Sequence, residues 1–282
     1  MELPTTLVRE LLTRALTEDL GSGDLTTQAV IPASAHVEAA FVFREAGLVC
    51  GLDVVAATFT LVDPTLVVMP LVQEGAQVAP GTVVATVSGS ARGVLTGERV
   101  ALNLFQRMSG IATLAARYVA AVAGTKARIL DTRKTTPGLR LLEKYAVRLG
   151  GATNHRFGLY DGVMLKDNHL AILAAQGIGL GAAVQQARAA VGPMVRVEVE
   201  VETVAQAGEA AEAGADLIML DNMPPEAMRA AVSLVQGRAL LEASGGVTLE
   251  RVRAIAESGV DYISVGALTH AARALDIGLD IG

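Results

Sequence analysis

Short apolar runs alternate with longer segments of helical composition from residue 127 to near the end of the chain. The apolar runs are residues 127–130, 163–166, 195–201, 217–220, 239–243 and 262–265. They precede helical segments at residues 139–149, 182–191, 204–213, 226–235, 249–257 and 268–275. This alternation is typical of a parallel sheet covered by helices. Because six units are fewer than the eight of a full barrel, we predict an open, incomplete α/β barrel of the TIM type.

A doubly wound sheet is the competing topology, but no G-x-G-x-x-G follows the first apolar run. Upstream of the barrel, the chain mixes helices and strands. Leucines at helical spacing predict a helix over residues 3–20, and residues 24–27 then open an extended stretch. Alternating apolar residues predict strands at 37–44, 47–50, 66–70 and 83–88, with two tight turns over residues 74–81.

We therefore predict two domains. The first is an N-terminal α/β sandwich over residues 1–112, on which the C-terminal tail, residues 272–282, is expected to pack. The second is an α/β barrel catalytic domain over residues 113–271. Residues 96–123 have the composition of a long helix, and Arg99, Asn103 and Arg107 share one of its faces. That face is either a basic stripe belonging to a site or an ordinary solvated surface.

The composition limits the class of protein. Hydrophobic residues make up 51% of the chain and Trp is absent, a mix that suits Val-rich parallel strands and Ala-rich helices. No apolar run reaches the ~18 residues of a membrane span, and the first residues lack the basic-then-apolar order of a signal peptide. Cys50 is the single cysteine, so no internal disulfide forms. We expect a cytoplasmic protein without a membrane anchor or a structural zinc site.

Charge is distributed unevenly along the chain. The formal net charge of −6 argues against non-specific binding to nucleic acid. Residues 126–166 nevertheless hold nine Lys or Arg against three acidic residues. All four lysines lie in this segment: Lys126, Lys134, Lys144 and Lys166. An acidic protein with one cationic segment suits a small anion better than a polyanion.

The centre of that segment is Asp131-Thr132-Arg133-Lys134-Thr135, which directly follows an apolar strand. A solvated turn would explain such a run by itself. The other predicted strands, however, also end in ionisable or Gly-rich elements. These elements are Lys166-Asp167-Asn168, the Glu198, Glu200 and Glu202 series, Asp221-Asn222, Ser244-Gly245-Gly246 and Val265-Gly266-Ala267. Since the active site of such a barrel lies at the C-terminal ends of its strands, we predict a site there.

The strand-end residues separate into three chemical roles. The Ser244-Gly245-Gly246 and Gly266-Ala267 elements offer backbone N–H groups for a phosphate. Glu200 and Asp221 offer hard oxygen ligands, which suit Mg²⁺ bound together with a substrate phosphate. The cationic group suits carboxylates, and it consists of Arg133, Lys134, His155, Arg156 and Lys166. The predicted ligands are a phosphorylated molecule with a metal ion, and a small organic polyanion.

Motifs along nearly the whole chain resemble, in order, those of the quinolinate phosphoribosyltransferase family. They are Glu98-Arg99, Ser109-Gly110-Ile111-Ala112-Thr113, Asp131-Thr132-Arg133-Lys134-Thr135, Asn154-His155-Arg156, Lys166-Asp167-Asn168-His169, Glu198-Val199-Glu200, Leu220-Asp221-Asn222, Glu242-Ala243-Ser244-Gly245-Gly246 and Val265-Gly266-Ala267. The resemblance implies an N-terminal α/β sandwich followed by an open α/β barrel, assembled into dimers or larger oligomers. It also implies transfer of phosphoribosyl from phosphoribosyl pyrophosphate to quinolinate with loss of CO₂. The products are nicotinate mononucleotide and pyrophosphate, the cofactor is Mg²⁺, and the pathway is NAD biosynthesis.

The resemblance also implies a role for each matching residue. Arg99 is expected to reach the site of the neighbouring subunit. Thr132 lies in the charged motif, and Arg133, Lys134, His155, Arg156 and Lys166 match the quinolinate-facing positions. Glu200 and Asp221 match the ribose and metal-pyrophosphate side. The phosphate-binding loops match Ser244, Gly245, Gly246, Val265, Gly266 and Ala267. We assign catalytic roles to Lys134, Lys166, Glu200 and Asp221.

Two other functions remain open on the sequence alone. A paralogue of the same fold would transfer phosphoribosyl to another acceptor. Lys166 at a strand end would alternatively serve a Schiff-base aldolase. A carrier domain is disfavoured, because the hairpin-like residues 74–81 resemble biotinyl and lipoyl domains but no lysine precedes Lys126.

Overall fold

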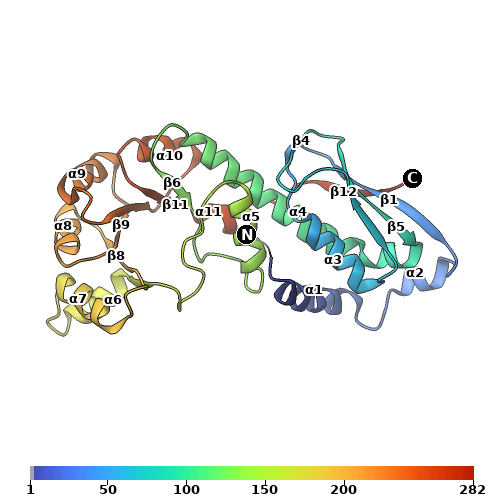
Figure 1. Cartoon of the computed structure of the whole chain (residues 1–282), viewed down its shortest axis with the longest axis horizontal. Helices are drawn as coiled ribbons and strands as arrows, with labels where there is room; N and C mark the ends of the chain where they lie inside the picture. The colour runs from blue at the N-terminus through green and yellow to red at the C-terminus, as the bar shows by residue number, and fades with distance from the viewer. Residues whose placement is uncertain (1–2) are drawn as a thin grey trace. The chain divides into compact units, whose positions relative to one another are not determined.

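The computed structural model describes residues 3–282, which form two compact units (Figure 1). The first unit contains the chain up to Ala115, residues 135–151 and residues 268–282. The second contains residues 116–134 and 152–267. Three separate segments therefore build the first unit. The sequence prediction assigns residues 1–112 and the tail, residues 272–282, to this domain, and residues 135–151 to the barrel.

The first unit is built around a four-stranded antiparallel sheet in the order β12-β1-β5-β3. Its strands are β1 (His36–Phe43), β3 (Val67–Pro70), β5 (Val83–Ser90) and β12 (Ile277–Ile281). A two-stranded antiparallel pair, β2 (Gly47–Leu48) with β4 (Gln77–Val78), forms a second small sheet. The helices of its N-terminal segment are α1 (Thr5–Leu20), α2 (Leu25–Val30), α3 (Leu52–Val62) and α4 (Ala91–Ala121), of which α4 continues beyond Ala115.

Aromatic side chains fill the core of the first unit. Phe41 and Phe43 on β1, Phe59 on α3 and Phe105 on α4 are fully buried. Phe41 packs edge-on against Phe59 and Phe105, with ring centroids 6.1 and 6.0 Å apart, and Phe43 meets Phe105 at 5.8 Å. Edge-to-face ring contacts of this kind stabilise the packing of α3 and α4 against the sheet, in addition to the stabilisation from buried apolar area.

The structure corrects one predicted element in this unit and adds another. Residues 24–27 do not open an extended stretch, because Asp24 caps helix α2 by accepting a hydrogen bond from the Thr27 N–H at 3.0 Å. Helix α3 was not predicted. Glu74 accepts hydrogen bonds from the N–H groups of Gly51 (2.6 Å) and Leu52 (3.1 Å) at its N-terminus, so a distant residue caps it.

Helix α5 (Arg140–Leu149) follows the first barrel strand in sequence but belongs to the first unit. Tyr145 donates a hydrogen bond to Glu74 at 3.2 Å. The carboxylate of Glu143, only 1% exposed, accepts from Arg107 of α4 at 2.8 Å. These polar contacts explain why α5 groups with α4 and the β2–β4 pair.

The end of the chain also belongs to the first unit. The predicted helix over residues 268–275 is reduced to α11 (Ala267–His270). Beyond it, Arg107 donates to the Ala272 carbonyl at 2.8 Å, and Leu275 donates to the Gln106 carbonyl at 3.1 Å. These bonds to α4 replace helical ones, and the chain then pairs with β1 as β12.

The second unit contains a six-stranded parallel sheet in the order β6-β11-β10-β9-β8-β7. Its strands are β6 (Arg128–Leu130), β7 (Val163–Leu165), β8 (Val197–Val201), β9 (Leu217–Asp221), β10 (Leu240–Ser244) and β11 (Tyr262–Ser264). Its connecting helices are α6 (Asp167–Ala174), α7 (Leu180–Ala190), α8 (Val204–Glu212), α9 (Pro225–Val235) and α10 (Leu249–Ala256), and α8 and α9 lie outside the strands (Figure 1).

The sheet of the second unit is open between its two edge strands. Within the part of the chain that the structure describes, no pairing joins β6 to β7. Residues 152–156 run beside β6 instead, with a parallel bridge between Leu130 and Thr153. The predicted class, an α/β sandwich domain followed by an open α/β barrel, is confirmed.

Candidate active site

The C-terminal ends of the parallel strands bring most of the predicted residues to one edge of the second unit. Asp221 ends β9 and Ser244 ends β10, and the two are direct register partners. Lys166 directly follows β7, Glu200 lies on β8, and Val265 directly follows β11. Because neighbouring strands run in parallel, these residues share one edge although up to about a hundred residues separate them in sequence.

Carboxylates accumulate around Glu200. Burial raises the pKa of Glu200, and the charges of Asp221 and Asp167 raise it further, whereas Lys166 lowers it. Two acidic groups thus repel a third that is part-buried, so a divalent cation would relieve the repulsion. The oxygen donors suit a hard ion such as Mg²⁺. These residues therefore fit the predicted cofactor.

Asn222 is a residue of this edge that the predicted set omits. Its side chain donates a hydrogen bond to the Asp221 carboxylate at 2.7 Å, and its N–H donates to the Ser244 carbonyl at 2.9 Å. Its backbone adopts a left-handed conformation with φ 52°. Asn tolerates this conformation better than most residues, which is the signal in the sequence. Asn222 thus ties the end of β9 to the end of β10.

The Ser244-Gly245-Gly246 turn requires glycine. Gly245 and Gly246 have φ values of +94° and +57°. A Cβ at Gly245 would lie 2.1 Å from the Asn222 side-chain oxygen, so no other residue fits there. Helix α10 begins only at Leu249, so this turn precedes the helix instead of forming its start. The other glycine element, Gly266-Ala267, does stand at a helix start, that of the four-residue α11.

Two arginines from loops of the second unit, Arg133 and Arg156, lie near each other. Burial lowers the pKa of Arg156, and the neighbouring Arg133 lowers it further. The guanidinium of Arg156 also donates to the Gly162 carbonyl at 3.0 Å. Within the charged motif, Lys134 donates its N–H to the Thr132 hydroxyl at 3.0 Å. Two neighbouring guanidinium groups favour an anion beside them.

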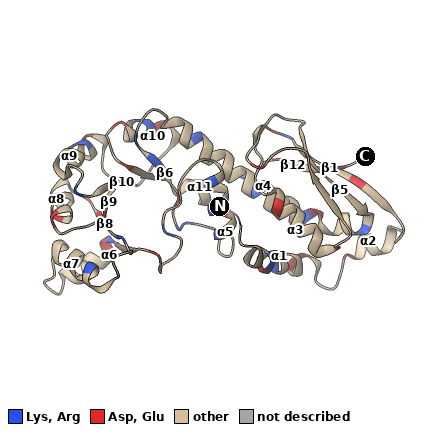
Figure 2. Cartoon of the chain, viewed as in Figure 1, with Lys and Arg blue, Asp and Glu red and all other residues tan. Residues whose placement is uncertain are grey.

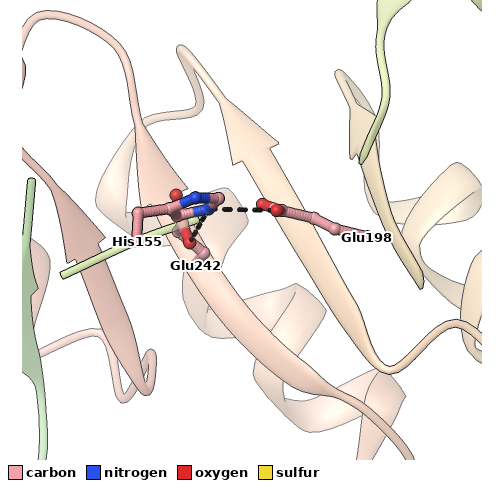
Figure 3. A group of neighbouring side chains, drawn as sticks. All are labelled: His155, Glu198 and Glu242. Carbon is pink, nitrogen blue, oxygen red and sulfur yellow. Dashed lines mark ion pairs between the residues drawn. The ribbon is translucent and has the colours of Figure 1, made fainter. Parts of the chain in front are cut away.

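His155 lies inside the barrel, between two glutamates (Figure 3). Its Nε2 is 3.0 Å from Glu198 Oε2 on β8 and 3.4 Å from Glu242 Oε2 on β10. Ser264 on β11 donates its hydroxyl to the other Glu242 oxygen. Glu198 is 4% exposed and Glu242 is fully buried. This group holds the greatest concentration of buried charge in the second unit, and only its histidine belongs to the predicted site.

The protons of this group are shared among its members. Burial lowers the pKa of His155, but the neighbouring carboxylates of Glu198 and Glu242 outweigh burial and raise it to about 10. Burial raises the pKa of Glu198 because it disfavours the charged carboxylate, and the negative charge of Glu242 raises this pKa further. His155 Nδ1 accepts the Arg156 N–H at 2.7 Å, which places the ring proton on Nε2. The additional proton that the raised pKa of His155 implies is therefore held by the three side chains together.

Asp131 holds the histidine from the opposite side. It directly follows β6 and is fully buried. One carboxylate oxygen accepts the His155 N–H at 2.8 Å, and the other accepts the Asn154 side-chain amide at 2.7 Å. The predicted set omits Asp131, Glu198 and Glu242. The period-two rule for strands identifies the glutamates as inward-facing, because they precede Glu200 and Ser244 by two positions.

A cavity of about 330 Å³ lies below these groups. His155, Arg156 and Glu198 line it, together with residues at the N-terminal ends of strands: Val163, Arg196, Leu217 and Tyr262. Lys166, Glu200 and Asp221 do not line it. An apolar groove of about 480 Å³ is separate from it and lies between β7, α6 and α7.

Arg99 differs from the other predicted residues because it lies in the first unit, on α4. Its side chain is 61% exposed, and the nearest carboxylate, that of Glu98, is 3.9 Å away. Arg107, which shares its predicted face, is bound to Glu143 and to carbonyls near the chain end, so it is not part of a free basic stripe. All other predicted site residues lie in the second unit.

Across residues 3–282, none of the helices is long and apolar enough to span a membrane.

Comparison with known proteins identifies both parts of the chain. Residues 24–109 match the N-terminal domain of quinolinate phosphoribosyl transferase, and residues 111–280 match the C-terminal domain. The nicotinate-nucleotide pyrophosphorylase (carboxylating) of Mycobacterium leprae is 46% identical over 281 residues, covering 97% of this chain and 96% of the relative. The crystal structure of NadC from Streptococcus pyogenes superposes with a TM-score of 0.95 at 42% identity, over 100% of this chain and 99% of that one. The nicotinate-nucleotide pyrophosphorylase of Francisella tularensis gives a TM-score of 0.93 at 36% identity, over 100% and 98%.

The matches cover both domains, in the order found here and at identities well above those at which only the fold is shared. Two glycine elements, a carboxylate pair and cations lie at one edge of the open barrel. The chain that carries them belongs to the quinolinate phosphoribosyltransferase family.

Proposed function

We propose that the protein transfers the phosphoribosyl group of phosphoribosyl pyrophosphate to the ring nitrogen of quinolinate. Loss of pyrophosphate and CO₂ gives nicotinate mononucleotide, a precursor of NAD. The observation that carries the proposal is the single strand edge of the second unit, where cations and carboxylates meet two glycine elements. This edge accommodates a dicarboxylate beside a phosphorylated sugar, which are the two kinds of group that the reaction joins.

The carboxylates act on the sugar. As the bond to pyrophosphate breaks, the ribose gains oxocarbenium character, and Glu200 and Asp221 stabilise its positive charge, as carboxylates do in glycoside chemistry. Magnesium, held by these two residues, would offset the charge of the leaving pyrophosphate. The backbone N–H groups of Ser244 to Gly246 and of Val265 to Ala267 bind phosphate oxygens.

The cations act on quinolinate. Arg133, Arg156 and Lys166 bind its carboxylates, and Lys134 adds electrostatic stabilisation. Thr132 accepts the Lys134 N–H, which orders the charged motif. Once ribosylated, the ring nitrogen is cationic and accepts the electron pair of the departing 2-carboxylate. A proton then replaces CO₂ on the ring carbon, so no side-chain nucleophile is needed and Lys166 forms no Schiff base.

We also propose a homodimer in which Arg99 completes the site of the neighbouring subunit. An arginine that is 61% exposed, with its nearest carboxylate at 3.9 Å, is available for such a contact. Mixing Arg99→Ala protein with Lys134→Ala protein should restore part of the activity, because some mixed dimers contain one intact site. Mixtures as inactive as their components would contradict a shared site. The cytoplasmic location is part of the same proposal.

One assay tests the reaction directly. Purified protein is incubated with quinolinate, phosphoribosyl pyrophosphate and Mg²⁺, and nicotinate mononucleotide is measured, with nicotinate as the control acceptor. The proposal is supported if the product forms with quinolinate as the acceptor and does not form with nicotinate. Turnover only with another acceptor would indicate a paralogue of the same fold. A covalent adduct at Lys166 after borohydride trapping with a carbonyl substrate would indicate an aldolase instead.

A further inference from the structure

The two glutamates beside His155 have no role in the proposed reaction. They lie one inward-facing position before the strand-end residues Glu200 and Ser244. One oxygen of each, Glu198 Oε1 and Glu242 Oε2, is buried without a hydrogen bond in the described structure. Burying two carboxylates in a barrel interior is costly unless something compensates. Their retention needs an explanation other than stability.

A metal ion is the first explanation to consider. His155 Nε2 and the two glutamate oxygens lie within 4.8 Å of one another. However, a histidine that binds a metal through Nε2 normally keeps a proton on Nδ1 and donates it to an acceptor. Here Nδ1 faces a donor, the Arg156 N–H at 2.7 Å. The ring proton therefore belongs on Nε2, where it is donated towards the glutamates, and the group is not built for a metal.

The hydrogen bonds of His155 identify what the group does instead. Both ring nitrogens contact protein groups, Nε2 the glutamates and Nδ1 the Arg156 backbone. The backbone N–H of His155 is held by Asp131. His155 thus links β8 and β10 to the loop that fills the opening between β6 and β7. The next residue on that loop is Arg156, which lies beside Arg133.

We propose that Glu198 and Glu242 are positioning residues that act through His155 to fix Arg156 for binding a substrate carboxylate. The inference rests on the proposed function, because it assigns Arg156 to the dicarboxylate. A loop without regular structure in the gap of an open sheet has few backbone bonds to orient it. The buried glutamates provide the missing anchor, so the histidine orients the cation instead of meeting the substrate through its own ring nitrogens.

The test measures binding of each substrate separately. Glu198→Ala should weaken quinolinate binding by about 10-fold or more, since it removes the carboxylate that lies 3.0 Å from His155 Nε2. The dissociation constant of phosphoribosyl pyrophosphate should change by less than about 2-fold, a change too small to reflect a lost interaction. Glu198→Gln should recover much of the loss, because its amide oxygen still accepts the Nε2–H, and it also serves if the alanine variant fails to fold. Glu212→Gln is the control, a glutamate of the same unit whose side chain is 75% exposed.

A double-mutant cycle decides whether Glu198 acts through the histidine. If it does, adding His155→Gln to Glu198→Ala should weaken quinolinate binding no further than the stronger single variant. Penalties that multiply, or equal losses for both substrates, would overturn the inference. So would stoichiometric zinc bound by the wild-type protein and lost from His155→Gln. If the wild-type protein binds no quinolinate, the proposed function itself is wrong. Quinolinate binding to the wild-type protein is therefore measured before that of any variant.

Discussion

The interiors of the two units differ in kind. The core of the first unit is filled by four fully buried phenylalanines and by aliphatic residues around them, and the buried Glu143 and Lys144 of the same unit lie outside this core. The second contains Asp131, Glu198 and Glu242, each at most 4% exposed, inside its open sheet. Along the ribbon, β5 carries no charged residue, whereas glutamates alternate with valines on β8 (Figure 2). The apolar core of the first unit thus contributes stability, whereas the buried carboxylates inside the sheet of the second unit cost stability and serve its chemistry.

The largest expected effect comes from breaking the aromatic core. Phe105→Ala removes a ring that contacts both Phe41 and Phe43, and should lower the free energy of unfolding by about 3–5 kcal/mol. Urea unfolding followed by circular dichroism measures this. If the free energy of unfolding falls by less than about 1 kcal/mol, the aromatic cluster is not a major source of stability in this unit.

The polar interior is tested at Asp131. Asp131→Ala leaves the His155 N–H and the Asn154 amide without their acceptor, at a cost of about 1–3 kcal/mol for each buried donor. Quinolinate binding should weaken in the same variant, because the loop before Arg156 loses its anchor. Loss of stability with unchanged quinolinate affinity would show that the network serves the fold alone.

The site residues should show the opposite balance. Arg133→Ala or Lys166→Ala removes a charge-assisted hydrogen bond to the substrate, worth about 1.5–3 kcal/mol, or roughly 10- to 150-fold in quinolinate affinity. Their unfolding free energies should stay within about 0.5 kcal/mol of wild type. Saturation by quinolinate measures the first effect and urea unfolding the second. Wild-type saturation in both variants would remove these residues from the binding site.

The pH dependence of stability separates the two interiors further. The folded protein raises the pKa of His155 from 6.5 to about 10, so it retains a proton that the unfolded chain loses. This contribution is complete below pH 6.5 and is lost as the pH rises through 10. Wild-type stability should therefore fall between pH 7 and pH 9.5 more than that of His155→Gln. Parallel curves for the two proteins would contradict the shared proton.

The smallest effect is expected at the surface of the first unit. Glu45 accepts hydrogen bonds from Arg273 and from the Asp276 N–H, which lowers its pKa to about 2. Arg273 is 71% exposed, so Glu45→Ala should cost no more than about 1 kcal/mol. The contribution is present above pH 4.5 and is lost as the pH falls towards 2. A thermal unfolding series from pH 7 to pH 3 checks it.

The sequence alone predicted those strands and helices whose own residues show a clear hydrophobic pattern. The alternation of apolar runs and helices predicted the six parallel strands, and charged or Gly-rich residues after each strand predicted the edge of the barrel. Family motifs named the same residues. These features depend on side-chain period and on the rule that parallel strands end together, so they can be read without knowing what packs against what.

The features that the sequence did not predict depend on contacts between residues that are distant in the chain. Glu74 caps α3 and binds Tyr145, Arg107 captures the chain end, and β12 joins β1 across more than two hundred residues. Likewise, the sequence places Glu198 and Glu242 on strands and in family motifs, but only the tertiary structure brings them together beside His155. Such pairings gain their energy from burial and hydrogen bonds formed after folding, which no local window of sequence contains.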